Sequence, residues 1–334
     1  MKLVTFVPRT GDAASRIGAL VDDVTVVDLQ RACELQHGGP RPHFQDMLAL
    51  LDGGTAAMDE SRALVERARM DLEAARVPLA TVRLLAPVPR PRSIRDCMAF
   101  EQHVTQATRT VVSWAFPPLA WLDAAVERVV GRPLIGPPRV WYERPVYYKS
   151  NPFSVVGPEA EVRRPRGSRK LDYELEFGVY IGRAGRDITE GDARLHVAGF
   201  TVFNDFSARD IQMREMRGRL GPAKGKDFDT GNAMGPWLVT PDEVGDPYAL
   251  SMVARVNGEE RSRGSSATMH HRFERLIAYV SQDETLHPGE FLGSGTVGGG
   301  CGLETDRYLA DGDVVELEVE RLGVLRNRVA PSAA

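Results

Sequence analysis

The pattern of hydrophobic and polar positions divides the chain into two parts. Short apolar runs near the N-terminus predict strands over residues 2–7, 16–21 and 25–29. Residues 58–76 are rich in Ala, Leu, Glu and Arg with helical spacing, and they predict an amphipathic helix that ends at Val77–Pro78. From about residue 140 onward, strand-like runs separated by glycine turns dominate, which predicts a C-terminal part rich in β-structure.

A proline-rich stretch over residues 85–91 (LAPVPRP) lies between the two parts. Such a composition is typical of a linker, so we expect a small α+β unit over residues 1–85 and a larger domain over residues 92–334. Within the larger domain, residues 104–145 form an apolar segment that contains three Trp and is broken by Pro. This segment is either a packed helix or dimer contact, or a lid beside an active site.

The run over residues 171–180 (LDYELEFGVY) predicts a strand with two carboxylates on one face. Glu174 and Glu176 lie two residues apart, and side chains at that spacing point to the same side of a strand. Two like charges this close on a buried sheet are costly unless a cation lies between them. Oxygen ligands suit Mg²⁺, Mn²⁺ or Ca²⁺ better than zinc. A solvated strand face remains the alternative until a third ligand is found.

A candidate third ligand follows the β-like run over residues 197–203. Asp205, Arg209 and Gln212 have the spacing of one face of a helix. That face would offer a carboxylate for a cation, a guanidinium for a planar carboxylate or enolate, and an amide for orientation. The alternative is an ordinary ion pair between Asp205 and Arg209 in the first helical turn. Beside the Glu-x-Glu strand, the metal interpretation is favoured.

Three motifs in this order resemble the fumarylacetoacetate hydrolase family: residues 172–176 (DYELE), 204–212 (NDFSARDIQ) and 293–298 (GSGTVG). The resemblance runs from about residue 90 to the C-terminus. It implies an α+β, mostly β fold, in which a small N-terminal α+β domain precedes a β-rich catalytic domain of mixed β-sandwich or roll type. It also implies a site for Mg²⁺ (or Mn²⁺ or Ca²⁺) held by Glu174, Glu176 and Asp205.

The resemblance further implies a catalytic dyad. His103 takes the place of the family's catalytic histidine, and Glu304 takes the place of its partner. A carboxylate beside the ring fixes its tautomer and raises its basicity, so the ring can deprotonate water. Some members carry a fourth metal carboxylate at a place that reads Ala99 here, so we expect three protein carboxylates. Asp96 would join them only through a backbone shift, and Glu101 is the reserve partner for the histidine.

The remaining site residues are also assigned by resemblance. Lys226, in AKGKDF, is expected to neutralise a developing oxyanion together with Arg209. Tyr148 and Gln212 are expected to contact the substrate. Thr296 offers a hydroxyl and flanking backbone amides that would bind a carboxylate.

Composition narrows the functional classes. The 334 residues are 43% hydrophobic and 26% charged, as in soluble globular proteins, and the net charge of −4 argues against a nucleic-acid surface. No apolar stretch reaches the roughly 20 residues of a membrane span. From the composition of residues 1–9 we expect no signal peptide. Its three cysteines are few, odd in number and widely spaced, which favours a reducing cytoplasm and argues against a zinc site.

The resulting prediction is a cytoplasmic, homodimeric, metal-dependent hydrolase that cleaves a carbon–carbon bond in a ketonic substrate (EC 3.7.1). The substrate would be a small 1,3-dicarbonyl or acylpyruvate-type acid, as in the catabolism of aromatic compounds. The alternative is a 2-keto acid decarboxylase, isomerase or hydratase/dehydratase that uses the same metal–enolate site. A non-catalytic metal-binding dimer module has the least support, because the dyad and Arg209 are all present.

Overall fold

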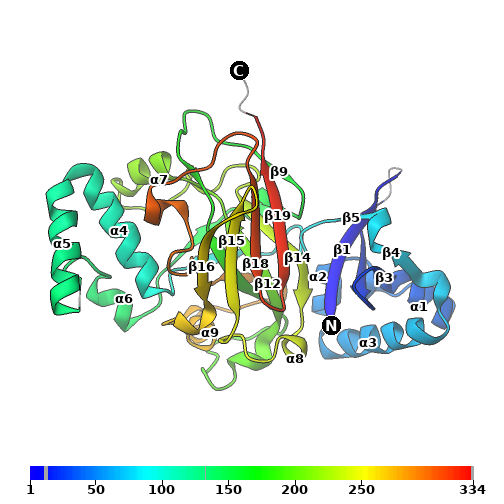
Figure 1. Ribbon diagram of the computed structural model, residues 1–334. Helices are drawn as coiled ribbons and strands as arrows, with labels where there is room; N and C mark the ends of the chain where they lie inside the picture. The colour runs from blue at the N-terminus through cyan, green and yellow to red at the C-terminus, as the bar shows by residue number, and fades with distance from the viewer. Residues whose placement is uncertain (11–13, 132, 332–334) are drawn as a thin grey trace.

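The computed structural model describes residues 1–10, 14–131 and 133–331. The N-terminal part lies at one end of the molecule and a group of three helices at the other, with the β-rich body between them (Figure 1). The N-terminal helices are α1 (Leu29–His37), α2 (Met47–Asp52) and α3 (Gly54–Met70). Helix α1 begins where the Asp28 carboxylate accepts a hydrogen bond from the Arg31 N–H, and it ends at Gly38, whose φ of 79° suits a residue without a side chain.

The largest sheet forms the wall on which the site is built. In hydrogen-bonded order it contains β4 (Arg76–Pro78), β3 (Thr25–Asp28), β2 (Arg16–Leu20), β1 (Lys2–Pro8), β14 (Asn232–Val239), β12 (Val197–Asp205), β11 (Leu175–Ile181), β17 (Phe291–Gly293), β6 (Ile94–Cys97) and β7 (Tyr147–Ser150). Two further strands, β5 (Val82–Leu84) and β8 (Val155–Val156), pair with β1 and β14.

A second sheet packs against this wall. Its order is β16 (Glu259–Ser265), β15 (Ser251–Val256), β18 (Val314–Val319), β19 (Gly323–Val329) and β9 (Glu161–Val162). The core between the sheets contains Leu175 and Phe177 of β11 together with Met252 and Leu317 of the second sheet. Helix α9 (Phe273–Val280) closes this core, and the short helix α8 (Pro241–Val244) follows β14. The predicted α+β, mostly β fold is therefore confirmed.

The N-terminal strands continue the large sheet. Lys2 and Leu3 of β1 pair with Val239 and Leu238 of β14, and the N-terminal core reaches Phe203 of β12. The boundary predicted at residues 85–91 stays a prediction, and the pairing means that any division into domains crosses a shared sheet.

The long N-terminal helix is shorter than predicted. Helix α3 covers residues 54–70 instead of 58–76, and residues 76–78 form strand β4, which pairs with β3. Arg76 was predicted to be the last residue of this helix. Its side chain instead donates hydrogen bonds to the carbonyl oxygens of Ala68 and Arg69 and so caps the end of the helix. The helix-favouring composition of residues 71–76 does not reveal that the helix ends before them.

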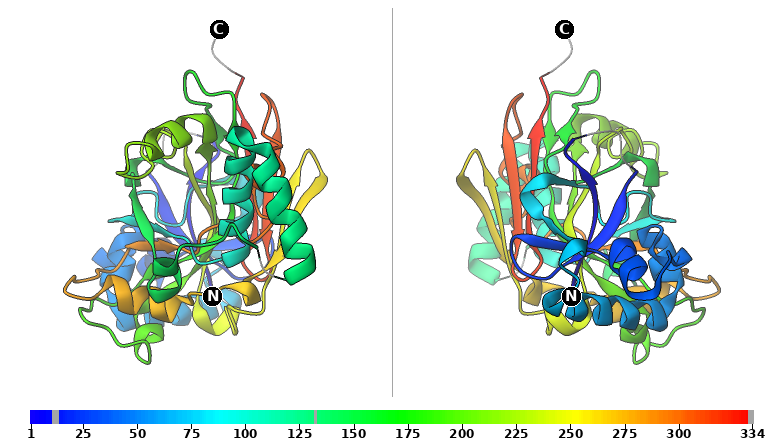
Figure 2. Two further views of the ribbon diagram at one scale, coloured as in Figure 1. Left: turned by 90° about the vertical axis from the view of Figure 1, so that its left-hand side faces the viewer. Right: turned by 90° about the vertical axis from the view of Figure 1, so that its right-hand side faces the viewer.

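The apolar segment over residues 104–145 is largely helical. Helices α4 (Glu101–Ala115) and α5 (Pro117–Val130) lie side by side, and α6 (Arg139–Glu143) follows them (Figure 2). The buried Asp123 pairs with Arg109 and accepts hydrogen bonds from the N–H groups of Leu134 and Ile135, which holds the hairpin together. Several large apolar side chains nevertheless remain exposed: Trp114, Phe116, Leu119, Trp121, Leu122, Val129 and Val130. Across the described residues, no helix has both the length and the hydropathy needed to cross a membrane.

Candidate active site

Four carboxylates meet at the centre of the large sheet. Each offers an oxygen that lies within 4.8 Å of the others, and each side chain belongs to a residue that is at most 4% exposed. We call them the acidic cluster: Asp96, Glu174, Glu176 and Asp205. The alternation predicted for residues 171–180 explains the arrangement, because Leu175 and Phe177 enter the core while Glu174 and Glu176 point to the other side. The alternative of a solvated strand face is wrong.

Asp96 belongs to this cluster. The structure therefore brings four carboxylates together, whereas we expected three because the family's fourth carboxylate position is occupied by Ala99. Asp96 lies in β6, opposite Gly293 of β17, and a Cβ atom added to Gly293 would be 2.3 Å from the Asp96 Oδ1 atom. The missing side chain at Gly293 therefore makes room for the carboxylate. Ala99 offers no carboxylate and makes hydrogen bonds only through its backbone: its N–H donates to the carbonyl of Ser294, and its carbonyl accepts from the N–H of His270.

Asp205 reaches the cluster from a strand, not from a helix. It is the last residue of β12, whereas α7 (Arg209–Met216) begins only at Arg209, so the predicted helical face over residues 205–212 is wrong for Asp205. Between Asp205 and α7 lies the short strand β13 (Ser207–Ala208), which pairs with β10 (Leu171–Asp172). Arg209 does not pair with Asp205 as the alternative interpretation held, because its guanidinium bonds to Asp172 and Glu174.

The acidic cluster fits an oxygen-coordinated divalent cation. One oxygen each of Asp96, Glu176 and Asp205 is buried and makes no hydrogen bond within the described structure. Buried acceptors without partners are costly, and a cation would satisfy all three. Burial, reinforced by the neighbouring carboxylates, raises the pKa of Glu176 and Asp205 well above their ordinary values, and burial raises that of Asp96 to about 6. The donor set is that of Mg²⁺, Mn²⁺ or Ca²⁺.

Three predicted residues line the acidic cluster. The Lys226 ammonium bonds to both Glu174 and Asp205, and the Tyr148 hydroxyl donates to Asp205. Burial disfavours the charge on Lys226, but the attraction of Asp205 and Glu174 outweighs it and raises the Lys226 pKa. Thr296 donates to Glu176 over 3.2 Å. Lys224, in contrast, is exposed.

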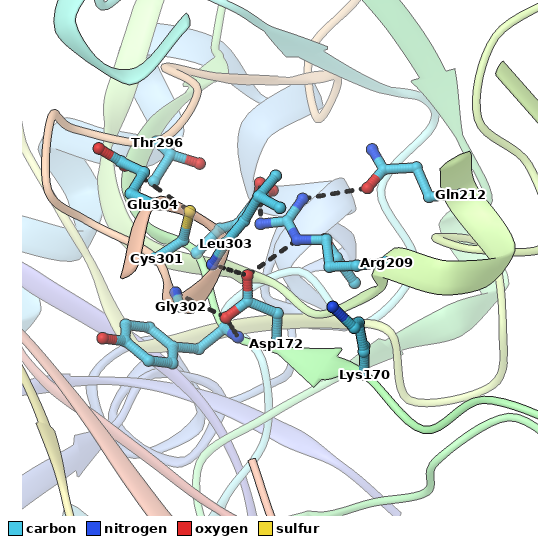
Figure 3. A network of polar contacts seen from close by, with 12 residues as sticks. Lys170, Asp172, Arg209, Gln212, Thr296, Cys301, Gly302, Leu303 and Glu304 are labelled. Carbon is cyan, nitrogen blue, oxygen red and sulfur yellow. Dashed lines mark hydrogen bonds and ion pairs between the residues drawn. The ribbon is translucent and has the colours of Figure 1, made fainter. Parts of the chain in front are cut away.

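A second network joins the cluster to the C-terminal glycine turn (Figure 3). Arg209, only 2% exposed, donates from Nε to Asp172 over 2.8 Å, from one Nη to Glu174 over 2.7 Å and from the other to Gln212 over 3.1 Å. Asp172 also accepts the N–H groups of Gly302 and Leu303 at 2.7 and 2.8 Å. Sequence reasoning assigned no role to Asp172, although a carboxylate directly before the Glu-x-Glu strand was the available signal.

The predicted pairing of His103 with Glu304 is present. His103 lies in α4 and Glu304 in the 3-10 turn Gly302–Thr305, and the His103 Nδ1 atom is 2.9 Å from Oε1 of Glu304. A carboxylate only accepts, so we assign the proton to Nδ1, which leaves Nε2 free to act as a base. The N–H groups of Gly299 and Gly300 donate to Glu304 at 2.8 and 3.2 Å and fix its carboxylate. The reserve partner Glu101 is exposed and accepts from the Tyr142 hydroxyl instead.

The family model described as fumarylacetoacetate (FAA) hydrolase C-terminal matches residues 126–330. The chain belongs to the fumarylacetoacetate hydrolase family. Among solved structures, a fumarylacetoacetate hydrolase from Exiguobacterium antarcticum superimposes with a TM-score of 0.71 at 28% identity, over 99% of both chains. A maleylpyruvate hydrolase from Sphingobium sp. SYK-6 superimposes with a TM-score of 0.70 at 22% identity, over 99% of both chains, and shares the fold.

Two curated relatives from this family match the same proportion of the chain. The human mitochondrial oxaloacetate tautomerase FAHD2A is 44% identical over 188 residues, which are 56% of this chain and 59% of the relative. The 2,4-didehydro-3-deoxy-L-rhamnonate hydrolase of Sphingomonas sp. (strain SKA58) is 43% identical over 188 residues, which are 56% of this chain and 65% of the relative. The match thus spans about three fifths of each relative.

Replacing Glu176 by Gln should weaken metal binding, because the change keeps the shape of the side chain but removes one negative charge from the acidic cluster. We expect the Kd for Mg²⁺ or Mn²⁺, measured by calorimetric titration, to rise by roughly tenfold or more. Glu190→Gln, a change at an exposed carboxylate, is the matched control and should leave the Kd unchanged. Equal affinity in the two variants would show that the cluster does not hold the ion.

The effect of Mg²⁺ on stability should depend on pH. A carboxyl pKa raised on folding means that the metal-free folded protein binds protons more tightly than the unfolded chain. The contribution of Asp96, Glu176 and Asp205 to stability therefore falls as the pH rises from the ordinary carboxyl range through about 6, the pKa of Asp96. A divalent ion replaces those protons, so the rise in Tm on adding Mg²⁺ should be larger at about pH 7.5 than at about pH 5. An equal rise at both pH values, measured by scanning calorimetry, would contradict this coupling.

Proposed function

We propose that this protein is a divalent-metal-dependent enzyme that hydrolyses a carbon–carbon bond in a 1,3-dicarbonyl or acylpyruvate-type acid. The observation that carries the proposal is the hydrogen bond between His103 and Glu304, next to the acidic cluster. The cluster explains how a dicarbonyl acid would be bound and activated. The dyad adds a general base for water, which enolate chemistry alone does not require.

Each site residue has its own role in the proposed reaction. A divalent ion held by the acidic cluster would polarise the carbonyl oxygens of the substrate. Glu304 holds the Nδ1–H of His103, so that Nε2 accepts a proton from the attacking water. Lys226, whose ammonium bonds to Glu174 and Asp205, would supply positive charge to the developing oxyanion of the substrate. Arg209 is held by Asp172, Glu174 and Gln212, so we assign it to positioning Glu174 and to supplying positive charge through that contact.

Substrate contacts remain proposals for three residues. Tyr148 and Thr296 reach the acidic cluster with their hydroxyls, and Gln212 orients Arg209 through its amide oxygen. Tyr148 and Thr296 contact different carboxylates of the cluster, Asp205 and Glu176, so their hydroxyls would meet different oxygens of a small acid. A cytoplasmic location and a role in the catabolism of aromatic compounds likewise stay predictions.

The second candidate is a tautomerase or isomerase that uses the acidic cluster for enolate chemistry without water attack. It is favoured by the human relative, which is named as an oxaloacetate tautomerase and is about as similar to this chain as the Sphingomonas hydrolase. Decarboxylation and hydration or dehydration would use the same groups. A non-catalytic dimer module accounts for none of the buried contacts between His103, Glu304 and the glycine turn.

One assay separates these functions. The protein is incubated with Mg²⁺ and a panel of 2,4-dioxo acids, and the loss of enol absorbance is followed. Product analysis then distinguishes hydrolysis, which gives two acids, from decarboxylation, which gives CO₂, and from isomerisation, which changes no mass. Formation of two acids supports the proposal, whereas turnover without a change of mass supports the tautomerase.

His103→Ala should abolish hydrolysis while it leaves Mg²⁺ binding intact. Loss of a positioned general base typically costs about 10²–10⁴-fold in rate. Tautomerisation of the bound acid should survive, and KM should move little, because His103 is not assigned to ground-state binding. Glu304→Gln should also lower kcat, because the ring loses the charge that stabilises its protonated form.

The control for this variant is His37→Ala, which removes a surface histidine whose Nε2 atom lies 3.4 Å from Glu60. It should keep normal kcat and KM. Near-normal hydrolysis by His103→Ala would show that the dyad is not the base, and Glu101 would then be tested.

The exposed apolar side chains of α4 and α5 support a further proposal, that the chain is a homodimer. Trp121 is 74% exposed and Phe116 is 66% exposed, and a pairing of two copies would cover them. Light scattering should give twice the 36.8 kDa of one chain. Trp121→Lys should shift the mass towards one chain, whereas Val24→Lys, at an exposed position in the N-terminal part, should not. A mass of one chain for the unaltered protein would contradict the proposal.

A further inference from the structure

Three different metal-binding atoms converge beside the acidic cluster. The Nδ1 atom of His103 lies 2.9 Å from Oε1 of Glu304 and 3.9 Å from Sγ of Cys301, and Sγ lies 3.6 Å from the same Oε1 atom. Cys301 is 1% exposed and His103 is 8% exposed, so the group is largely shielded from solvent. We call His103, Cys301 and Glu304 the dyad cluster.

We propose that the dyad cluster is a second metal site, selective for a soft divalent ion such as Zn²⁺, and that occupation of this site inhibits the enzyme. Imidazole, thiolate and carboxylate are the ligands that zinc takes in proteins. At zinc bond lengths of about 2.0–2.3 Å, tetrahedral ligand atoms lie about 3.3–3.6 Å apart. Of the three distances in the dyad cluster, 2.9 Å is shorter than this range, 3.6 Å lies at its upper limit and 3.9 Å is longer. Small side-chain rotations would bring the three ligands to zinc-binding distances, and water would take the fourth position.

The backbone around the dyad cluster is already fixed. Cys301 lies between glycines, and Glu304 is held by the N–H groups of Gly299 and Gly300. On the other side of Cys301, Asp172 binds the N–H groups of Gly302 and Leu303. Cys301 and Glu304 therefore come from a turn that is anchored at both ends, and His103 comes from helix α4. The anchored turn lowers the entropic cost of arranging these ligands around an ion.

Charge also favours a cation at this place. In the two clusters and the side chains bonded to them, carboxyl groups outnumber the cations Arg209 and Lys226, and with a divalent ion in the acidic cluster the formal charge remains negative. These carboxyl groups belong to Asp96, Asp172, Glu174, Glu176, Asp205 and Glu304. The two sites would select different ions, since Mg²⁺ prefers oxygen ligands and Zn²⁺ accepts nitrogen and sulfur.

Zinc at the dyad cluster would remove the general base. When the ion binds Nδ1 of His103, the proton on that atom moves through solvent to Nε2, and the ring stays neutral. The Cys301 thiol releases its proton to solvent as the thiolate forms. Nε2 then carries a proton and does not accept one from water. The inhibition rests on the proposed hydrolysis, whereas the binding does not.

The test of binding uses Co²⁺ as the probe, with excess Mg²⁺ present. Cobalt bound to a thiolate shows a sulfur-to-metal charge-transfer band in the near ultraviolet, whereas cobalt bound to oxygen ligands does not. We expect this band in the unaltered protein and in Cys33→Ala, a variant of a buried thiol in the N-terminal part. It should be absent from Cys301→Ala and be displaced by Zn²⁺. Cys301→Ser takes the place of the alanine variant, with the same expectation, if the latter does not fold.

The absence of the band from the unaltered protein, or its persistence in the Cys301 variant, would overturn the proposal. Inhibition is measured separately, with each rate relative to that of the same protein without zinc. Zinc should inhibit the unaltered enzyme at concentrations at least about tenfold below those needed for Cys301→Ala. Equal sensitivity, relieved by more Mg²⁺, would mean that zinc acts at the acidic cluster and would overturn the inhibitory role. If no hydrolysis is found, the cobalt spectrum still decides the binding.

Discussion

The burial of several carboxylates in one wall of the large sheet is the constraint on which the site depends. Glu176 and Asp205 are fully buried, and neither has a partner for every oxygen. Isolated charges in such surroundings are strongly disfavoured, so the groups must hold protons, face cations or bind metal. The chain supplies Lys226 and Arg209 as permanent cations, and both bond to Glu174. Their presence leaves Asp96, Glu176 and Asp205 with the free oxygens that a divalent ion would use.

Asp172 connects this constraint to the dyad. Its carboxylate accepts hydrogen bonds from Arg209 on one side and from the N–H groups of Gly302 and Leu303 on the other. The turn that carries Glu304 is therefore tied to the residue that holds Glu174. The acidic cluster and His103 thus keep a fixed relation across segments that are far apart in the sequence. Fixed geometry of this kind contributes to catalysis because reacting groups need no rearrangement.

Side-chain alternation and motif resemblance correctly predicted the arrangement of several candidate site residues. The predictions failed where a residue's position depends on contacts with strands that are distant in the sequence. Alternation placed Glu174 and Glu176 on one side of a strand, and motif resemblance paired His103 with Glu304 across the chain. Asp96 was expected to join only through a backbone shift, because its access to the cluster depends on the missing side chain of Gly293 in the neighbouring strand. No local pattern around Asp96 reports that pairing. Asp205 was placed on a helix because its spacing to Arg209 is helical, although β12 extends through it.

The same reasoning explains how one family can hold both tautomerases and hydrolases. Enolate chemistry needs the polarising site, which here is formed by residues of β6, β11 and β12 and the residue before β11. Hydrolysis also needs a base, and His103 comes from α4, at the start of the helical segment that lies against one end of the β-rich body (Figure 1). The acidic cluster is formed by residues of the sheet. The pairing of His103 with Glu304, in contrast, depends on how the peripheral helix α4 packs against the glycine turn. Under the proposed function, a change in that contact would remove hydrolysis and leave the acidic cluster intact. The proposal therefore assigns the choice between the two chemistries to the contact between α4 and the turn that carries Glu304.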